Sequence, residues 1–161
     1  MRLGVAADLS ARLGEWFVSA VGASYTRATF REDGPRFAEG DLLPFVPQLV
    51  LRSDTALTPR LTRWVDRDLV ARLGFGTSFL FERPLPFGEI GNDVFLVDGM
   101  AGLRWGEIEL ALEVFNLLDA AWYDGQFVYA STFGPTVTTL PERHVTAGAP
   151  RTFLGTLALH L

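Results

Sequence analysis

Residues 108–119 read IELALEVFNLLD, and the chain closes with residues 149–161, APRTFLGTLALHL. In the first run apolar and polar side chains alternate, so Leu110 and Leu112 share one side of an extended chain, and Glu109 and Glu113 the other. A helix would scatter these apolar positions around its axis, whereas a period of two is that of a β-strand. Both runs therefore predict β-strands with one apolar face.

Similar alternation upstream predicts more strands, so that the chain is all-β with about seven meandering antiparallel strands. The predicted segments are 3–13, 16–31 (poorly alternating, with no predicted register), 49–57, 64–83, 94–105, 108–115 and the last run. At about 3.3 Å per residue, the 64–83 segment is several times longer than a usual globular strand. Strands of this length suit a barrel that crosses a bilayer and projects beyond it.

The connections alternate in length. Short turns are predicted at 13–15, 58–63 and 104–107, and long connections at 32–43, 84–92 and 120–150, the last with room for a strand extension at 126–133. Outer-membrane barrels have short periplasmic turns and long outer loops. Trp16, Trp64 and Trp105 all stand beside the predicted short turns, which suits an aromatic girdle at the periplasmic interface.

The final third of the chain resembles a known family. Residues 113–123, EVFNLLDAAWY, followed by GAPRTF at 148–153 and an apolar strand, resemble the end of a TonB-dependent outer-membrane receptor. In that family an Asn-Leu-(Leu/Phe)-Asp element ends one strand, and a Pro-(Gly)-Arg-Thr element starts the last. The resemblance covers 108–119 and 148–161; upstream only the strand pattern agrees.

The resemblance implies that residues 1–161 form the C-terminal part of an antiparallel transmembrane β-barrel in the cell outer membrane, without a plug domain. Expected partners are outer-membrane lipid and the barrel-assembly machinery, with the TonB system reached only through the missing plug. Family members usually end on an aromatic residue that this machinery reads. Leu159 and Leu161 stand in the usual aromatic places here, which puts efficient assembly in doubt.

Composition narrows the class of protein. Hydrophobic residues make up 48% and charged residues 20% of the 161 residues, so the chain is no disordered tail. No run approaches the roughly 18 apolar residues of a membrane helix. A soluble β-sandwich or barrel with a well-filled core would alternate in the same way. The net charge of −5 disfavours nucleic acid as a partner, and the absence of cysteine removes disulfides and thiol chemistry.

Residues 1–10, MRLGVAADLS, lack the continuous apolar core of a signal peptide. Because an outer-membrane protein must be exported, we expect the sequence to be a piece of a longer receptor and to transport nothing alone. Seven strands would be part of the roughly 22 that such transporters use. Bacterial single-chain barrels also have an even number of strands, so an odd number indicates an incomplete barrel.

No reaction chemistry is predicted. His144 and His160 have no second ligand at metal spacing, so neither a metal site nor a cofactor is expected. Glu109 and Glu113 would lie about 13 Å apart along a strand, which is too far for a glycosidase pair. No phosphate loop or nucleophile elbow is present. We therefore expect no enzyme.

Binding is the expected activity. Aromatic residues in or near the predicted outer segments are the candidate ligand-binding residues: Phe37, Trp122, Tyr123, Phe127 and Tyr129. The resemblance implies that such residues, with a separate plug, hold an iron chelate, cobalamin or another scarce nutrient. Packing within the loops explains the same residues equally well.

The leading hypothesis is therefore a barrel segment of a receptor for TonB-dependent uptake. One alternative is a small complete outer-membrane barrel of eight strands, counting 126–133, with a structural or adhesive role. Another is a soluble lipocalin-like binder with an apolar interior. The direction of four apolar side chains in the 64–83 segment discriminates, because a membrane barrel turns them outward and a lipocalin turns them inward. They are Leu69, Leu73, Phe75 and Phe79.

Overall fold

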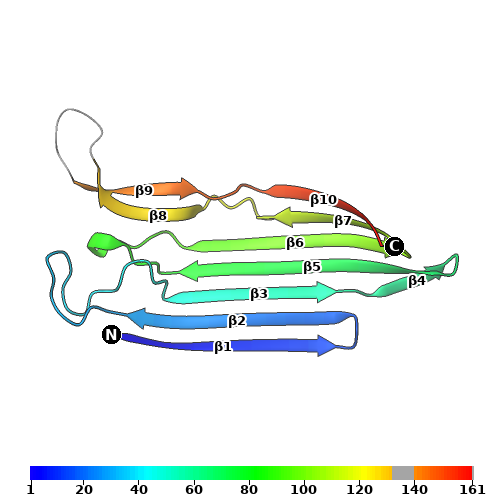
Figure 1. Ribbon diagram of the computed structural model, residues 1–161, viewed down its shortest axis with the longest axis horizontal. Helices are drawn as coiled ribbons and strands as arrows, with labels where there is room; N and C mark the ends of the chain where they lie inside the picture. Colours follow the sequence, from blue (N-terminus) through cyan, green and yellow to red (C-terminus); the bar gives the residue numbers. More distant parts are fainter. Residues whose placement is uncertain (132–139, 161) are drawn as a thin grey trace.

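The computed structural model describes residues 1–131 and 140–160, and the chain is built from antiparallel β-strands (Figure 1). The strands are β1 (Arg2–Leu13), β2 (Phe17–Ala28), β3 (Leu49–Leu57), β4 (Arg60–Trp64), β5 (Arg67–Phe81), β6 (Val94–Trp105), β7 (Ile108–Phe115), β8 (Tyr123–Ala130), β9 (Pro141–Ala147) and β10 (Thr152–Leu159). A single turn of 3₁₀ helix, η1 (Pro86–Gly88), interrupts the connection between β5 and β6. Among the described residues, no helix is long and apolar enough to span a membrane.

The main sheet has the order β1-β2-β3-β5-β6-β7-β10, and β4 also pairs with β5. Consecutive strands pair as neighbours until β7, after which β8 and β9 form a separate two-stranded sheet and β10 returns to pair with β7. The predicted all-β class and antiparallel meander are thus confirmed. Within the described residues nothing pairs with the outer sides of β1 and β10, so the sheet is open rather than a closed barrel.

Several strand boundaries agree with the alternation. The strands at 94–105 and 108–115 occur as predicted. The second strand is shorter than the predicted 16–31 because it ends at Ala28, and the fourth begins at Arg67 rather than Trp64. The structure gives the register of the second strand, which the sequence left open. In β2, Val21 lies opposite Leu9 of β1 on one side and opposite Ser53 of β3 on the other.

The predicted turn at 58–63 is wrong. After Pro59 the chain continues as β4, which pairs with β5 across an irregularity between Arg60 and Thr62. Pro59 cannot donate to the ladder, but its carbonyl accepts a hydrogen bond from Ala71 N (3.0 Å), so the pairing with β5 survives the proline. The true turn lies at Val65 and Asp66, whose φ values of 48° and 56° match those of a tight two-residue hairpin.

The long connection predicted at 120–150 also needs correction, because it contains the β8–β9 hairpin. The predicted extension at 126–133 overlaps β8 (Tyr123–Ala130), while its last residues, and Leu161, lie outside the described residues. Since β8 pairs with β9 and not with the main sheet, it supplies no eighth barrel strand.

Directly opposed residues of paired strands share a face, so the faces can be followed across the sheet. One row of opposed residues is Leu13, Phe17, Leu57, Leu73, Ala101, Leu112 and Gly155. The face containing this row, here called the apolar face, also carries Leu9, Phe75 and Leu110. These three side chains are 72%, 50% and 60% exposed. The chain therefore presents a broad uncovered hydrophobic surface.

The opposite face, here called the polar face, carries the charged side chains of the main-sheet strands, apart from Arg27 and Arg67 near strand ends. Its charged residues are Arg2, Asp8, Arg12, Arg52, Asp54, Arg60, Arg63, Asp68, Arg72, Asp98, Arg104, Glu109 and Glu113. Three hollows of about 400, 300 and 780 Å³ lie over the main sheet, and this face supplies most of their lining. Nearly all charged side chains of the main-sheet strands therefore lie on one face of the sheet.

Hydroxyl groups on the apolar face bond to one another. Ser19 Oγ lies 2.9 Å from Thr55 Oγ1 across β2 and β3, and Ser53 Oγ lies 2.7 Å from Thr77 Oγ1 across β3 and β5. These pairs satisfy polar atoms without water, which lowers the cost of placing them in an apolar medium.

The two ends of the sheet differ. Short turns follow β1, β4 and β6 at one end, and the long connections gather at the other (Figure 1). At the short-turn end the rings of Trp64 and Trp105 lie 5.1 Å apart, and Trp105 Nε1 donates to Trp64 O at 3.1 Å. Trp16 stands beside the β1–β2 turn, so the predicted tryptophans share this end.

Candidate functional site at the loop end

The loop end of the sheet is built from three segments that meet in space. They are residues 29–48, residues 82–93 and the β8–β9 hairpin. Backbone bonds join the first two, since Phe45 N donates to Pro84 O at 2.8 Å and Gln48 N donates to Glu82 O at 3.1 Å. The first two long loops are therefore held together by backbone hydrogen bonds.

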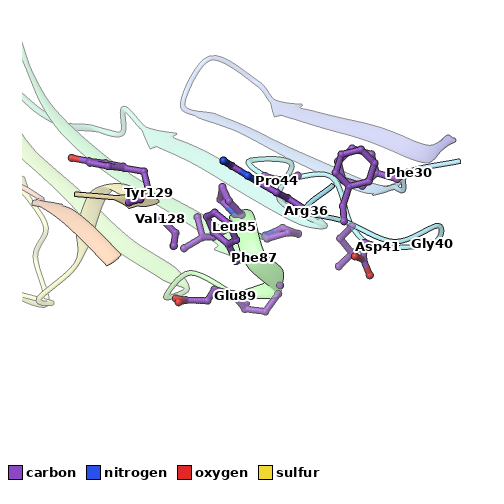
Figure 2. A pocket seen from close by; sticks show the side chains of 17 residues that line it. Phe30, Arg36, Gly40, Asp41, Pro44, Leu85, Phe87, Glu89, Val128 and Tyr129 are labelled. Carbon is purple, nitrogen blue, oxygen red and sulfur yellow. The ribbon is translucent and has the colours of Figure 1, made fainter. Parts of the chain in front are cut away.

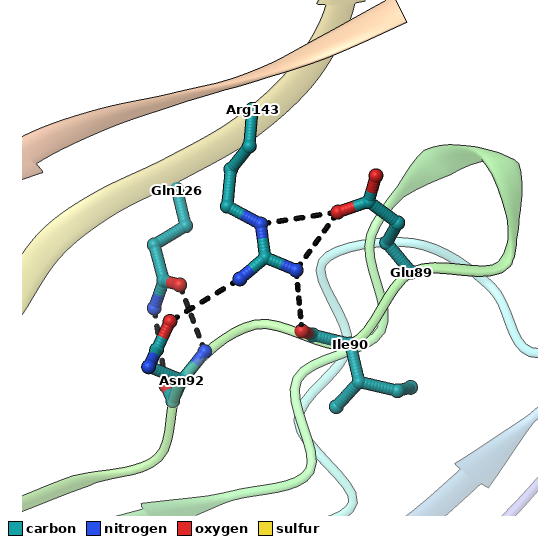
Figure 3. Close-up of polar contacts among 5 residues, drawn as sticks. All are labelled: Glu89, Ile90, Asn92, Gln126 and Arg143. Atoms are coloured by element: carbon teal, nitrogen blue, oxygen red, sulfur yellow. Dashed lines mark hydrogen bonds and ion pairs between the residues drawn. The ribbon is translucent and has the colours of Figure 1, made fainter.

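Arg143 of β9 anchors the hairpin to the segment before β6 (Figure 3). Its Nε and Nη2 atoms lie 3.0 and 2.8 Å from Glu89 Oε2. Nη2 also donates to Ile90 O at 2.9 Å, and Nη1 donates to Asn92 Oδ1 at 3.2 Å. A planar guanidinium suits such a set of acceptors, and its charge is balanced by that of Glu89.

Gln126 of β8 makes the second attachment. Its side chain is only 1% exposed. Its Oε1 accepts from Asn92 N at 2.8 Å, and its Nε2 donates to Asn92 O at 3.0 Å. Gly91 makes room for this pairing, because a Cβ there would lie 3.2 Å from Gln126 Oε1.

A pocket of about 490 Å³ opens between the three segments (Figure 2). Two apolar residues of its lining, Leu85 and Val128, are buried. Phe30 and Phe37 stack with ring centroids 3.7 Å apart and form part of the lining. The volume lies within the range of small-molecule sites.

Three charged side chains also line this pocket: Arg36, Asp41 and Glu89. The guanidinium of Arg36 lies over the Phe87 ring, with its carbon 5.9 Å from the ring centroid. Asp41 Oδ2 accepts a hydrogen bond from Ala38 N at 2.7 Å. The pocket therefore combines aromatic surfaces with a few polar groups at defined positions.

The sequence-predicted ligand-binding residues separate into two groups. Phe37 and Tyr129 line the pocket. Phe127 instead packs against Phe45, with centroids 5.8 Å apart. Trp122 and Tyr123 lie at the base of the hairpin, away from the pocket lining.

Trp122 has a structural contact of its own. Its Nε1 donates to Ala149 O at 3.0 Å, and its ring lies so close to Gly148 that a Cβ there would be 2.1 Å from it.

Four further pocket-lining residues were not predicted from the sequence: Arg36, Asp41, Phe87 and Glu89. Gly, Pro and acidic residues indicate where loops occur, but they do not indicate which loops lie next to each other in space.

The residues that carry the family resemblance form a junction between strands. Asn116 is 4% exposed and has a φ of 52°. Its Nδ2 donates to Ala120 O at 2.9 Å and to Ala149 O at 3.2 Å, and its N donates to Asp98 Oδ1 at 2.9 Å. Asp119 Oδ2 lies 3.6 Å from Arg151 Nη2. These contacts tie the end of β7 to β6 and to the start of β10.

The two histidines have neighbours of different kinds. His144 Nε2 lies 3.1 Å from Ser131 Oγ, and its ring stacks on Tyr129 with centroids 3.9 Å apart. His160 Nε2 lies 2.9 Å from Glu109 Oε2, and the other oxygen of Glu109 pairs with Arg72. Across residues 1–131 and 140–160 no group of three or more His, Cys, Asp or Glu could hold a metal ion.

Comparison with protein-family models, curated proteins and solved structures found no match to this chain.

Proposed function

We propose that the chain is a segment of an outer-membrane β-barrel of the TonB-dependent receptor type, whose apolar face contacts lipid and whose polar face lines the lumen. In this role it contributes to energised uptake of a scarce nutrient bound at the loop end. The observation that carries the proposal is the segregation of side chains across seven paired strands, with exposed apolar residues on one face and charges on the other.

Covering the apolar face with lipid would be energetically favourable. Moving one exposed Leu or Phe side chain from water into an apolar environment is worth about 1.5–3 kcal/mol. Leu9, Phe75 and Leu110 on this face are at least half exposed. Lipid would cover such a surface, and the Ser19–Thr55 and Ser53–Thr77 pairs leave few polar atoms there to be desolvated.

The hollows on the sheet favour this proposal over a lipocalin-like binder. A lipocalin holds its ligand against an apolar interior. Here the hollows over the main sheet are lined chiefly by the polar face, including Arg52, Asp54 and Asp98. That arrangement is the one expected of a lumen wall.

A complete eight-stranded barrel is the less favoured membrane alternative, because the main sheet is open and β8 pairs only with β9. We propose instead that further strands complete the barrel and that a plug domain couples it to the TonB system. On this proposal lipid and the barrel-assembly machinery are partners. The 161-residue chain alone should fail to carry ligand into liposomes, so ligand entry in that assay would overturn this part.

Single cysteines give the decisive experiment, since the chain has none of its own. Two matched pairs of neighbours are suitable: Leu9→Cys with Ser10→Cys in β1, and Leu112→Cys with Ala111→Cys in β7. Each protein, labelled with an environment-sensitive fluorophore, is folded into vesicles that contain lipids with a quencher on the acyl chain.

We expect strong quenching at Leu9→Cys and Leu112→Cys, and weak quenching at their polar-face neighbours. Equal quenching within both pairs would contradict the assignment of faces. A chain that stays monomeric in water, does not associate with vesicles and shields position 112 from aqueous quenchers would instead support the soluble alternative.

A further inference from the structure

We infer that the loop-end pocket binds a small planar aromatic carboxylate, with Arg36 taking the carboxylate and the aromatic side chains taking the ring. The inference rests on the proposed role of the loop end as the ligand-facing side of a receptor, and it names the chemistry of that ligand. The cavity of about 490 Å³ has room for one fused-ring molecule.

The charge of the expected ligand follows from the three charged residues of the lining. Glu89 is neutralised by Arg143, which meets its Oε2 at 2.8 Å. Asp41 Oδ2 accepts a backbone hydrogen bond from Ala38 N, which holds this carboxylate against its own loop. In the described part of the chain Arg36 forms no ion pair. The guanidinium of Arg36 is therefore a cation in the lining whose N–H donors no carboxylate of the described residues occupies, and an anionic group of a ligand would suit it.

The shape of the expected ligand follows from the rings. Phe30 and Phe37 both line the pocket and stack with an interplanar angle of 12°, and Phe30 lies at one end of the pocket. Tyr129 lies at the other end, and Arg36 extends between the two ends (Figure 2). Aromatic side chains favour offset or edge contacts with another ring. A flat ring system between these ends would contact aromatic surface while its acid group meets Arg36.

Arg36 is also partly oriented before binding. Its guanidinium lies over Phe87 at 5.9 Å, a cation–π arrangement that restricts the side chain. A guanidinium held in this way can meet a carboxylate through two parallel N–H donors with less loss of side-chain freedom.

The pocket is poorly suited to a polyhydroxylated sugar. Much of the lining apart from Arg36, Asp41 and Glu89 is apolar, so hydroxyl groups of a bound sugar would lose hydrogen bonds to water without replacing them.

Three fluorescent probes of equal size test the ligand chemistry. They are 2-naphthoate, its neutral isostere 2-naphthamide and the cation 2-naphthylmethylammonium, each titrated into the detergent-solubilised 161-residue chain against a detergent-only blank. We expect 2-naphthoate to bind about tenfold more tightly than 2-naphthamide, with the cation weakest. Equal affinity for the acid and the amide, or a preference for the cation, would overturn the inference.

A matched pair of variants tests the assigned residue. Arg36→Gln should weaken 2-naphthoate binding about tenfold and leave 2-naphthamide unchanged, because only the charge-assisted bond is lost. Arg31→Gln removes the same charge from the same loop at a residue outside the pocket lining, and should leave both affinities unchanged. Circular dichroism confirms that both variants fold. The inference is wrong if the two variants lose affinity equally, or if neither does.

These titrations are separable from the test of membrane location. Binding of 2-naphthoate through Arg36 by a chain that shows no lipid contact would refute the receptor proposal and retain the pocket. Strong lipid quenching on the apolar face without selective naphthoate binding would refute only the ligand class.

Discussion

The side-chain amide of Gln126 pairs with the backbone of Asn92 through both its oxygen and its nitrogen, at 2.8 and 3.0 Å. A neighbouring strand would offer the same donor and acceptor, so one buried side chain replaces a stretch of β-ladder. Through this pairing and the Arg143 contacts, the β8–β9 hairpin forms one wall of the pocket without belonging to the main sheet.

Loss of this pairing should release the hairpin. Gln126→Ala leaves the backbone N–H and C=O of Asn92 without partners. We expect the free energy of docking the β8–β9 hairpin onto the segment before β6 to become less favourable by about 1–3 kcal/mol. Hydrogen exchange of β8 and β9 should rise while that of β5 and β6 stays protected. Glu142→Ala changes an exposed residue of the same hairpin and serves as the control. Unchanged exchange in Gln126→Ala would show that the contact does not hold the hairpin.

A charge introduced on the apolar face should block membrane insertion. Leu9→Arg places a guanidinium among lipid chains, which costs about 2–4 kcal/mol at the bilayer midplane and less near the surface. Ser10→Arg adds the same group to the polar face of the same strand and should be tolerated. The yield of folded protein in vesicles, read as resistance to added protease, checks the difference. Equal yields would be incompatible with lipid at this face.

The Glu109 cluster should stabilise the last strand. Glu109 is buried and joins Arg72 of β5 to His160, which directly follows β10. Glu109→Leu leaves the Arg72 charge unbalanced, and we expect a loss of about 1–3 kcal/mol in unfolding free energy. Glu113→Leu, on the same face of the same strand, is the control.

Denaturant titration in detergent measures both variants. Adding Arg72→Met to Glu109→Leu should recover part of the loss, because the unpaired charge is removed. Additive losses in the double variant would show that the two side chains are not coupled.

The Asn116 junction should separate the contribution of hydrogen bonds from that of backbone conformation. Asn116→Ala removes the bonds to Ala120 and Ala149 and places an alanine at a φ of 52°, for an expected cost of about 2–4 kcal/mol. Asn116→Gly also loses the bonds but adopts this φ without strain, so it should be about 1 kcal/mol less damaging. Thermal or denaturant unfolding of both variants tests the order. A more stable alanine variant would contradict it.

Much of the strand pattern was accessible from local sequence. The strands at 94–105 and 108–115 followed from alternation alone, because one-sided burial imposes a period of two on each strand independently. The error at 58–63 has an identifiable cause. Pro59 resembles a turn residue, and only the bond from Ala71 N to its carbonyl shows that pairing continues beyond it. The turn at Val65 and Asp66 lacks the glycine or asparagine that usually marks such turns.

The candidate site was less accessible. Aromatic residues in the long connections predict ligand-binding positions, and Phe37 and Tyr129 do line the pocket. Trp122, predicted on the same basis, covers Gly148 instead. Arg36 and Glu89 were missed, since nothing local distinguishes them from solvent-exposed charges.

The amino-acid sequence by itself determined the all-β class and the segregation of apolar from charged side chains, because these follow from the period of side chains along each strand. The antiparallel meander followed from the short connections, since parallel neighbours need long crossovers. Tertiary structure alone decided which loops meet. Arg143 and Glu89 are 54 residues apart, and their contact depends on how the β8–β9 hairpin folds back over η1. Local pattern carries no information about such pairings, because they arise only after the sheet has placed the loops at one end.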